Sequence, residues 1–584
     1  MRSAHSPLPL HRLFSLVPVA LALAACGGGG TDNSSPVAPP IPATLTLTGT
    51  AATGAAIGGM RVDAKCGGGT AGNGTSQADG AFTVTVAAGQ LPCVLQVTTV
   101  DGTVLHSLAT GSGSAARANI TPASELVVAS LSAGTPASYY SGFVASTATA
   151  LTQAKVDAAV QRVGDTLAAA GAALPAGVNL LTAPLKAANG STAGDALDTA
   201  LDALKTKLAS GAPGTDFKTA LAALADAVAK ASPDAPVSAL SNTASLPPDM
   251  LLQPAASNCS ALRSGKYRLV YNRNHAAGSH DTTVLTIDAP KLTVVDADGT
   301  VTQLTAAGHC RFKTPENGDM AVSQAGVIVA QIQAGSSYHL GVAFPVQTHP
   351  LSALAGEWNS LQLDRTEDQG PIILTHGTWT VDTAGKLTAA TYCENGADCF
   401  TGTLAATPGF PVITSSINAD GGFNRTGSAG DWTDRVFLYK TGGGELLSVS
   451  LTDAGGHLSL STRKVVNPQP TVGDVRQAWN FTQNNNYTAS GASEGKNTIR
   501  SVDATANSYL RDAVTNLTTG VTRPETFRIN NPREGYNLRV GETVTASDAS
   551  SSTVTSFIAM GLRGTGLTVV GFPSTNTLVL SVGK

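Results

Sequence analysis

Short runs in which apolar and polar residues alternate occupy the part of the chain that follows residue 43. The strand candidates are Thr44–Thr48, Met60–Lys65, Ala81–Val86 and Val94–Thr99. A period of two residues is typical of strands with one buried face. Asp79-Gly80 and Asp101-Gly102 stand between such runs, where Asp-Gly favours a tight turn. The pattern predicts an all-β domain over residues 44–122.

A helical period replaces the alternation over residues 123–250. Apolar residues recur there at steps of four, three and four in three sets: Val156, Val160, Val163 and Leu167; Leu197, Leu201, Leu204 and Leu208; Phe217, Leu221, Leu224 and Val228. Each set lies on one face of a helix. Thr152 and Thr215 are the expected N-caps, because a threonine hydroxyl accepts from a free amide of the first turn. We predict a small α-helical bundle, and the same stripes also fit faces that bind a partner.

Alternation returns from residue 258 to the end of the chain. The strand candidates are Tyr267–Tyr271, Thr378–Val381, Val436–Tyr439, Leu446–Leu451, Leu458–Ser461 and Leu578–Val582. Trp358 and Trp479, each followed by asparagine, lie 121 residues apart, and Leu458 and Leu578 lie 120 residues apart. These matched offsets indicate related β-rich units. We expect two of them, over residues 351–466 and 471–584, and a third, divergent β-rich unit over residues 258–350.

Residues 44–122 carry a pattern that resembles a known family. The pattern reads Val62-x-Ala64-x-Cys66, then Asp79-Gly80-x-Phe82-x-Val84-x-Val86, then Pro92-Cys93-x-Leu95-x-Val97. It resembles the carboxypeptidase regulatory-like domain, which is a small prealbumin-like β-sandwich. The resemblance implies a structural or binding module rather than an enzyme. The expected fold class is therefore multi-domain and mainly β: an N-terminal β-sandwich, a small α-helical bundle, and C-terminal β-barrel or β-sandwich units.

A second resemblance concerns the region 351–584. Gly356-Glu357-Trp358 is similar to the Gly-x-Trp motif that opens the first strand of lipocalin-like barrels. In that family the tryptophan plugs one end of the barrel. The resemblance implies a carrier of small apolar ligands.

The N-terminal segment predicts export and a lipid anchor. Arg2 and Arg12 precede a mostly apolar run from Leu13 to Ala25, which is typical of a secretory signal peptide over residues 1–25. Leu23-Ala24-Ala25-Cys26 resembles the lipobox of bacterial lipoproteins, which implies cleavage before Cys26 and acylation, with palmitate among the chains, of that residue. Residues 26–43 are then the lipidated cysteine and a flexible tether. Because Gly27 follows the cysteine, the resemblance favours the outer membrane, at the periplasmic face or the cell surface.

The seven cysteines are consistent with export to the cell envelope. Acylation of Cys26 accounts for the odd number, and exported compartments favour oxidation of the rest. The chain has no C-x-x-C pair that would favour a metal site instead. Pairing neighbours within each domain predicts three disulfides, Cys66–Cys93, Cys259–Cys310 and Cys393–Cys399.

Composition and charge argue against a nucleic-acid partner and against a membrane-spanning helix. The net charge is −4, charged residues make up only 13% of the chain, and lysine and arginine form no cluster, so nucleic acid is excluded as a partner. Beyond the signal peptide no apolar run is long enough for a membrane-spanning helix. The membrane contact that we expect is therefore the lipid anchor alone.

Several motifs invite a chemical interpretation, and the residues around them favour a structural one. Gly491-Ala492-Ser493-Glu494-Gly495 fits the nucleophile elbow, but its flanks read as loop and no histidine follows it. Gly67–Gly72 fits G-x-G-x-x-G, but the next element predicted is a strand and not a helix, so a flexible loop is expected.

The candidate metal and carboxylate sites also favour a structural interpretation. His275, His280 and His309 match no zinc spacing. Asp296-Ala297-Asp298-Gly299 resembles the start of a calcium loop, but Thr305 stands where that loop needs glutamate, so a hairpin turn is expected. Asp364, Glu367 and Asp368 fall in an expected loop. We assign no catalytic residue, no metal and no cofactor.

Three functions remain compatible with these features of the sequence. The first is a non-catalytic, lipid-anchored envelope module that binds a glycan, protein or other ligand, or that has a structural role. The second is a lipocalin-like carrier of small apolar ligands. The third is an envelope hydrolase whose site is assembled in space from distant residues, because such sites are recognised by geometry rather than by motif.

Overall fold

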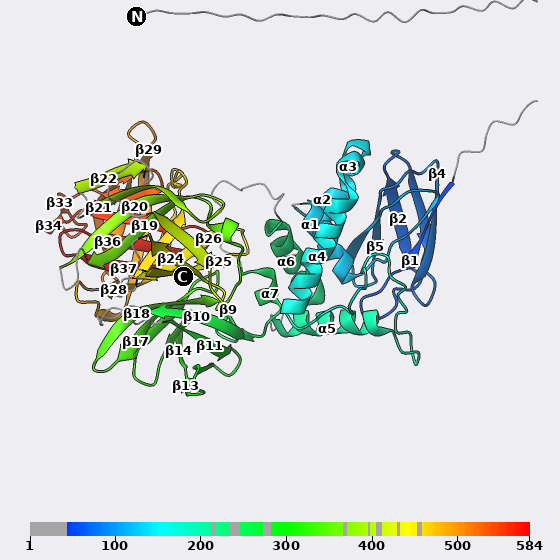
Figure 1. Cartoon of the computed structure of the whole chain (residues 1–584), viewed down its shortest axis with the longest axis horizontal. Helices are drawn as coiled ribbons and strands as arrows, with labels where there is room; N and C mark the ends of the chain where they lie inside the picture. Colours follow the sequence, from blue (N-terminus) through cyan, green and yellow to red (C-terminus); the bar gives the residue numbers. More distant parts are fainter. Residues whose placement is uncertain are drawn as a thin grey trace, which may run out of the picture. The chain divides into compact units, whose positions relative to one another are not determined.

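The structure is a computed structural model that describes residues 44–132, 134–211, 216–232, 246–271, 282–365, 371–394, 398–403, 412–428, 433–452 and 458–584. The predicted signal peptide, Cys26 and the tether lie outside these residues. The fold is multi-domain and mainly β, as the alternation predicts (Figure 1). The boundaries between domains stay a prediction.

The N-terminal part is a sandwich of two sheets. Its strands are β1 (Thr44–Thr50), β2 (Arg61–Cys66), β3 (Ala71–Thr75), β4 (Ala81–Ala87), β5 (Cys93–Thr98), β6 (Val104–Ala109) and β7 (Ala115–Arg117). One sheet has the order β4-β1-β7 and the other β3-β2-β5-β6. Leu47, Val62 and Val84 are fully buried between them. Cys66 and Cys93 lie opposite each other in the β2–β5 register and form a disulfide.

The glycine-rich segment of the sandwich differs from the prediction. A flexible loop was expected at Gly67–Gly72, and its last residues instead begin strand β3. Gly72 and Gly74 of β3 lie against the backbone of β4 in the opposite sheet, where a Cβ would come within 2.4 and 2.2 Å of carbonyl oxygens. The glycines therefore allow two sheets to approach closely. As expected, no dinucleotide-binding helix follows them.

Seven helices are found in the described residues. They are α1 (Pro122–Ser132), α2 (Pro136–Ser141), α3 (Ala145–Ala150), α4 (Gln153–Ala169), α5 (Ala196–Gly211), α6 (Phe217–Lys230) and α7 (Pro248–Leu251). The three apolar stripes correspond to α4, α5 and α6, which confirms the prediction. Thr152 caps α4 as expected, whereas Asp216 caps α6, so the prediction of Thr215 as the cap is wrong. None of the described helices has the length and the apolar sequence needed to cross a membrane.

The C-terminal part begins with a nine-stranded antiparallel sheet, which we call the curled sheet. A short hairpin of β8 (Ala255–Ala256) and β9 (Cys259–Arg263) precedes it. Its strands are β10 (Gly265–Tyr271), β11 (Thr282–Asp288), β12 (Thr293–Val295), β13 (Val301–Gln303), β14 (Thr305–Gly308), β15 (Arg311–Lys313), β16 (Asp319–Val322), β17 (Ile328–Ala334) and β18 (Ser337–Pro345). The order is β13-β12-β11-β10-β18-β17-β16-β15-β14.

The two edges of the curled sheet are joined through the chain itself. Edge strands β13 and β14 are consecutive, and only Leu304 separates them. This one stretch of chain therefore pairs with β12 over its first half and with β15 over its second half. The sheet therefore closes on itself, as an up-and-down barrel does. Its fourth strand, formed by β13 and β14, bends where the two halves meet.

A second nine-stranded sheet repeats this topology. After the 3₁₀ turn η1 (Leu351–Leu354), its strands are β19 (Gly356–Arg365), β20 (Ile372–Val381), β21 (Leu387–Glu394), β22 (Asp398–Thr403), β23 (Ile413–Ile417), β24 (Phe423–Gly427), β25 (Thr433–Lys440), β26 (Leu446–Thr452) and β27 (Leu458–Arg463). The order is β22-β21-β20-β19-β27-β26-β25-β24-β23. Cys393 is disulfide-bonded and lies opposite Cys399 in register. The side chain of Cys399 lies outside the described part, so their pairing stays a prediction.

The last unit is a closed barrel. It consists of β28 (Val475–Gln483), β29 (Ala489–Asp503), β30 (Ser508–Asn516), β31 (Val521–Ile529), β32 (Tyr536–Arg539), β35 (Phe557–Leu562), β36 (Leu567–Phe572) and β37 (Thr577–Gly583), while β33 (Glu542–Thr545) and β34 (Ser551–Val554) form a separate hairpin. In all three units the first strand pairs with the last.

Trp358 and Trp479, the two tryptophans that lie 121 residues apart, occupy matching positions in their units. Trp358 lies on β19 under the guanidinium of Arg463, whose carbon is 4.0 Å from the ring centre. Trp479 lies on β28 under the ammonium of Lys584 at 3.7 Å. In each case a cation at the end of the unit covers a tryptophan of its first strand. Trp358 is fully buried and its indole N–H donates to the Leu354 carbonyl.

Candidate ligand-binding cavity

The two faces of the curled sheet enter different cores. Val270, Val329 and Val342 belong to a core that also contains side chains of the second sheet and of the closed barrel, such as Leu361 and Leu580. Their neighbours along the strands point to the opposite face, because successive side chains of a strand alternate. That face is the inside of the curl.

The inside of the curl holds a cavity of about 450 Å³. Its apolar lining comes from both ends of the strand order: Leu269, Leu285, Ile287, Val294, Leu304, Met320, Ile328, Ala330, Ile332 and Ala343. Leu285, Val294 and Ile332 are half-buried and the other seven are buried. Side chains from β10 to β13 thus face side chains from β16 to β18 across one space. The volume lies within the roughly 300–1,000 Å³ typical of small-molecule sites.

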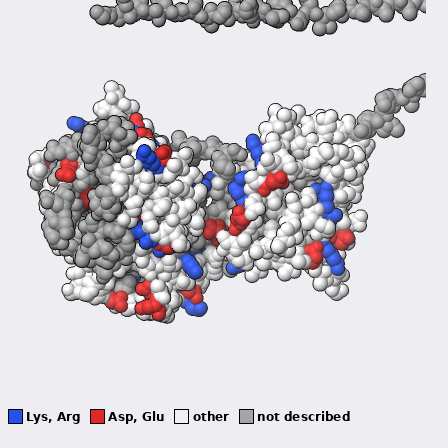
Figure 2. Space-filling view, in the orientation of Figure 1, with Lys and Arg blue, Asp and Glu red and all other residues white. Residues whose placement is uncertain are grey.

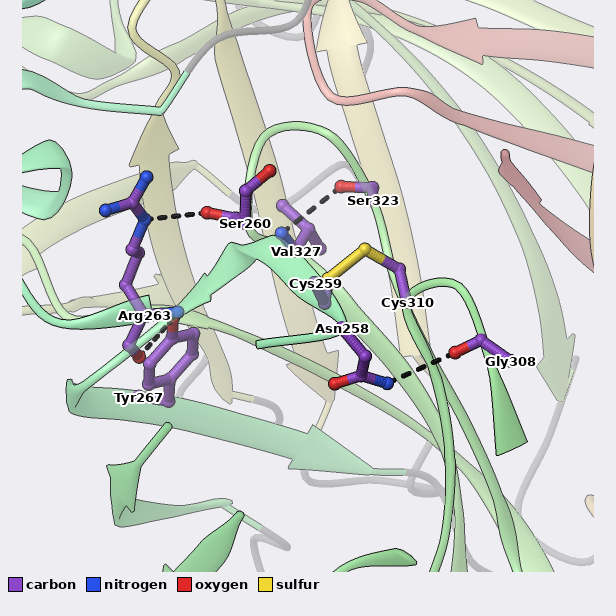
Figure 3. The surroundings of a disulfide bond; sticks show 9 residues. All are labelled: Asn258, Cys259, Ser260, Arg263, Tyr267, Gly308, Cys310, Ser323 and Val327. Atoms are coloured by element: carbon purple, nitrogen blue, oxygen red, sulfur yellow. Dashed lines mark hydrogen bonds between the residues drawn. A yellow bond between two sulfur atoms is a disulfide. The ribbon is translucent and has the colours of Figure 1, made fainter. Parts of the chain in front are cut away.

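One end of the cavity is closed by packed side chains and a disulfide. Tyr267 and Phe312 are fully buried there. Cys259 of β9 is bonded to Cys310, which follows β14. Figure 3 shows this disulfide beside the hydrogen bond, 3.2 Å long, that the Asn258 amide donates to the Gly308 carbonyl. Both links hold β9 against the turn after β14.

A tyrosine completes the closed end. The hydroxyl of Tyr267 donates to the carbonyl of Arg263 at 3.0 Å (Figure 3). Burial raises the pKa of Tyr267 well above its ordinary value, so the hydroxyl stays protonated. The guanidinium of Arg263 is held in turn by the carbonyl of Ser260 at 2.7 Å. These bonds fix the wall of the cavity at the end away from solvent.

The other end is open and carries polar groups. Asp296 directly follows β12, and Glu316 lies in the turn between β15 and β16. Thr302, Thr314, Gln331 and Gln333 complete the polar part of the lining. Both carboxylates are exposed. The site therefore combines an apolar interior, one sealed end and a polar mouth.

A buried His–Glu pair in the sandwich is structural. His106 of β6 is 1% exposed, and its Nδ1 lies 2.8 Å from a carboxylate oxygen of Glu125 in α1. The backbone N–H of His106 donates to the same oxygen, and its Nε2 lies 3.2 Å from the side-chain oxygen of Gln96. Both ring nitrogens have partners within the protein. The pair fastens α1 to the sheet.

The interior of the closed barrel is filled. Glu525 is 1% exposed and accepts from Arg511, Arg523 and Arg539 at 2.7 to 2.8 Å. Burial raises the pKa of Glu525, and the guanidiniums of Arg511 and Arg539 more than offset this, so the pKa lies below its ordinary value. The guanidinium of Arg511 also stacks on Phe527, 4.5 Å from the ring centre. The paired charges and aromatic rings act as barrel packing.

The motifs singled out in the sequence do not meet in a site. Ser493 lies within strand β29 and pairs with Asn480, so the expected loop around it is wrong and no nucleophile elbow is formed. His309 is exposed in the turn at the closed end, while His275 and His280 lie outside the described residues. No group of three or more histidine, cysteine or acidic side chains suited to a metal is found in the described part of the chain.

The remaining candidates have local roles. Residues 296–299 form the expected hairpin turn, with the Gly299 N–H donating to the Asp296 carbonyl at 3.0 Å. Asp364 lies within β19 and pairs with Ile373, so the loop expected there is wrong, and its carboxylate accepts from the hydroxyl of Tyr392 at 2.9 Å. Glu367 and Asp368 lie outside the described residues. Among the described residues of this group, only Asp296 lines the cavity.

The cavity residues were missed by the sequence reasoning. The Gly-x-Trp motif directed attention to residues 351–466, whereas the cavity lies in the unit before it. The available signal was weak: Leu285 and Ile287 alternate on one strand, and Val294 precedes the Asp298-Gly299 turn. Alternation shows that these residues share a face, but it does not show whether that face surrounds an empty space.

Comparisons with known proteins add little. No protein-family model and no curated protein matches the chain. Among solved structures, it is similar to a DUF3598-family protein of unknown function from Nostoc punctiforme, at 11% identity over 41% of this chain and 99% of that one, with a TM-score of 0.14. It is also similar to transferrin binding protein B from Neisseria meningitidis serogroup B, at 9% identity over 55% of this chain and 76% of that one, with a TM-score of 0.14. The corresponding protein of Haemophilus parasuis gives 10% identity over 55% and 75%, with a TM-score of 0.13. TM-scores this low carry no argument about fold or function.

Proposed function

We propose that the chain is a non-catalytic module that binds a small apolar ligand inside the curled sheet. One observation carries the proposal: a cavity of about 450 Å³ inside the curled sheet, lined by ten apolar side chains. Burial of apolar ligand surface against such a lining is favourable, at roughly 25 cal/mol per Å². Barrels of about eight strands are wide enough to hold one small ligand.

The polar groups of the lining favour binding over chemistry. The described lining offers hydroxyl, amide and carboxylate side chains at the mouth, and no histidine, cysteine or lysine. Among these groups the carboxylates of Asp296 and Glu316 could act as general bases, but both are exposed rather than desolvated beside a reacting group. A carrier or sensor of an apolar compound therefore fits the cavity better than a hydrolase does.

We also propose that the protein is exported and held in the cell envelope by acylation of Cys26, as the lipobox resemblance implies. The two disulfides Cys66–Cys93 and Cys259–Cys310 support this, because disulfides persist in oxidising compartments. The tether of residues 27–43 would separate the binding domains from the lipid surface. The similarity of residues 44–122 to regulatory-like domains stays a prediction, and it fits a spacer or accessory binding role.

The proposal is tested by titrating the full chain, in detergent-free buffer, with the neutral fluorophore N-phenyl-1-naphthylamine. We expect saturable binding with one site. Ala330→Trp places an indole in the cavity from β17, and we expect it to weaken binding at least about tenfold, which corresponds to about 1.4 kcal/mol. The matched control is Val301→Trp, because Val301 is 62% exposed on β13 and lies outside the lining.

A second cavity variant distinguishes a filled cavity from a misfolded chain. Thr302→Trp fills the mouth from the strand that carries the control, and Thr302 is only half-buried. We expect both cavity variants to keep the circular dichroism spectrum of the parent chain. Unchanged affinity in two folded cavity variants, or absence of saturable binding by the parent, would contradict the proposal.

A further inference from the structure

The mouth of the cavity carries charge of one sign. Asp296 and Glu316 are the only charged residues among the described lining. Asp296 directly follows β12, and Glu316 lies in the turn between β15 and β16. Figure 2 shows acidic atoms gathered over the part of the molecule where Figure 1 labels β13, the strand that follows Asp296.

The described hydrogen bonds to Asp296 come from neutral groups. Asp296 accepts hydrogen bonds from the Thr283 hydroxyl at 3.2 Å and from the backbone N–H of Ala297 at 2.7 Å. Within the described ranges, neither Asp296 nor Glu316 forms an ion pair. Both carboxylates are exposed to solvent at the mouth.

The cations closest to Glu316 along the chain are already engaged elsewhere. Arg311 and Lys313 both pair with Asp319, at 2.7 and 3.1 Å. Asp319 is buried and also accepts from the backbone N–H of Ala492 in β29. This cluster joins the curled sheet to the closed barrel, so its cations belong to that joint. Among the described lining residues, the charge at the mouth is therefore negative.

We infer that the ligand is an amphiphile with a positively charged head group, such as an alkylamine or alkylammonium compound. This inference rests on the proposed function. The apolar tail would occupy the cavity, and the head would lie between Asp296 and Glu316 at the mouth. An anionic amphiphile of the same length would place its charge beside two carboxylates and bind more weakly.

The test compares three ligands with the same dodecyl chain, each below its micellar concentration, as competitors of N-phenyl-1-naphthylamine. Dodecyltrimethylammonium is cationic, dodecanol is neutral and dodecanoate is anionic. At low ionic strength we expect the cation to compete most strongly and the anion least, with about a tenfold ratio between them. The ratio should fall in about 1 M salt, since the charges at the mouth are exposed and screened.

Variants separate the head-group inference from general effects of charge. In the double variant Asp296→Asn with Glu316→Gln we expect the cation-to-anion ratio to fall to near one, while the affinity for dodecanol stays unchanged. The control is Asp288→Asn, which removes an exposed carboxylate at the closed end that pairs with Lys291 at 2.7 Å. This control should keep the ratio.

The two proposals fail in different ways. If the fluorophore binds and the three dodecyl compounds compete equally, the head-group inference is overturned and the apolar site stands. A preference for dodecanoate would overturn the inference in the same way. If neither the fluorophore nor any dodecyl compound binds, the proposed function itself is wrong.

Discussion

His376 is a buried imidazole whose charge is set by its surroundings rather than by a partner. It lies on β20, is 1% exposed, and neither ring nitrogen has a hydrogen-bond partner in the described residues. Its ring contacts that of Tyr536 edge-on, with centres 5.7 Å apart. Burial, followed by the nearby charge of Arg533, lowers the pKa of His376 from 6.5 to about 4.

This pKa makes the protein sensitive to mild acid. The unfolded chain takes up a proton near pH 6.5, whereas the folded chain takes it up only near pH 4. The unfolded state therefore binds more protons in this window, and stability falls as the pH falls through it. We expect His376 to cost about 2 kcal/mol at pH 5 relative to pH 7, measured by urea unfolding at the two pH values.

His376→Leu tests this account. The variant should lose less stability between pH 7 and pH 5 than the parent, since the group that resists protonation is gone. Some loss should remain, because burial and then Lys440 also lower the pKa of His349 to about 4. An unchanged difference between the two pH values would show that His376 does not govern the acid response.

Single residues also show the limits of sequence reasoning at this site. Pairing neighbouring cysteines predicted the links present in the structure at Cys66 and Cys259, because each pair closes a loop within one domain. Asp296 was interpreted as part of a turn, which is right, yet its position at the mouth was not foreseen. That position depends on β15 and β16 pairing into the same curled sheet as β12. The local sequence does not specify this pairing.

At the scale of elements, strand β3 shows how small residues set the spacing of two sheets. A side chain at Gly74 would collide with the carbonyl oxygen of Thr83, which lies 2.2 Å from the ideal Cβ position. We expect Gly74→Val to lower the free energy of unfolding of the sandwich by more than about 2 kcal/mol, as backbone must move to admit the side chain. Differential scanning calorimetry of the full chain measures this as a lower midpoint for one transition.

The neighbouring residue provides the matched control. Asn73 lies on the same strand and is exposed, since its side chain points to the other face. Asn73→Val should leave the transition nearly unchanged or raise it slightly, because valine favours strands. Equal effects of the two valines would mean that the close approach of β3 and β4 is not what the glycine provides.

Elements were predictable where burial is one-sided. Helices α4, α5 and α6 each have one apolar stripe, and the stripe revealed them. Helix α1 is buried from Pro122 to Ser130, so it has no polar face to create a period, and the sequence reasoning missed it. Strand β3 was missed for a different reason: its alternate positions are glycines, which register neither as apolar nor as polar.

At the scale of the whole molecule, the lipid anchor is the prediction with the broadest consequences. We expect the chain from its native host to begin at a diacylated Cys26 and to partition with membranes. Cys26→Ser should abolish incorporation of labelled palmitate and release the chain into the soluble fraction. Ser35→Ala, in the same tether, should change neither. Labelled palmitate on the serine variant would place the lipid elsewhere.

The overall order of the chain was predictable from composition and periodicity: sandwich, helices, then β-rich units. The cavity was not, because its walls come from strands as far apart in the sequence as β10 and β18. Residues such as Leu269 and Ala343 lie side by side only after the strands have paired. A two-residue period identifies the face to which each belongs, while closure of the sheet depends on the bend at Leu304 between β13 and β14.

The pairing of first and last strands has a consequence for how such a chain grows. In the curled sheet Tyr267 lies opposite Pro345, in the second sheet Trp358 lies opposite Arg463, and in the barrel Ala478 lies opposite Gly583. The chain thus enters and leaves each unit at neighbouring points. Duplicating a unit in the gene adds a complete module between two adjacent ends, and the connecting peptides need not be rebuilt. Tandem copies can then diverge, one retaining a hollow interior while another becomes filled.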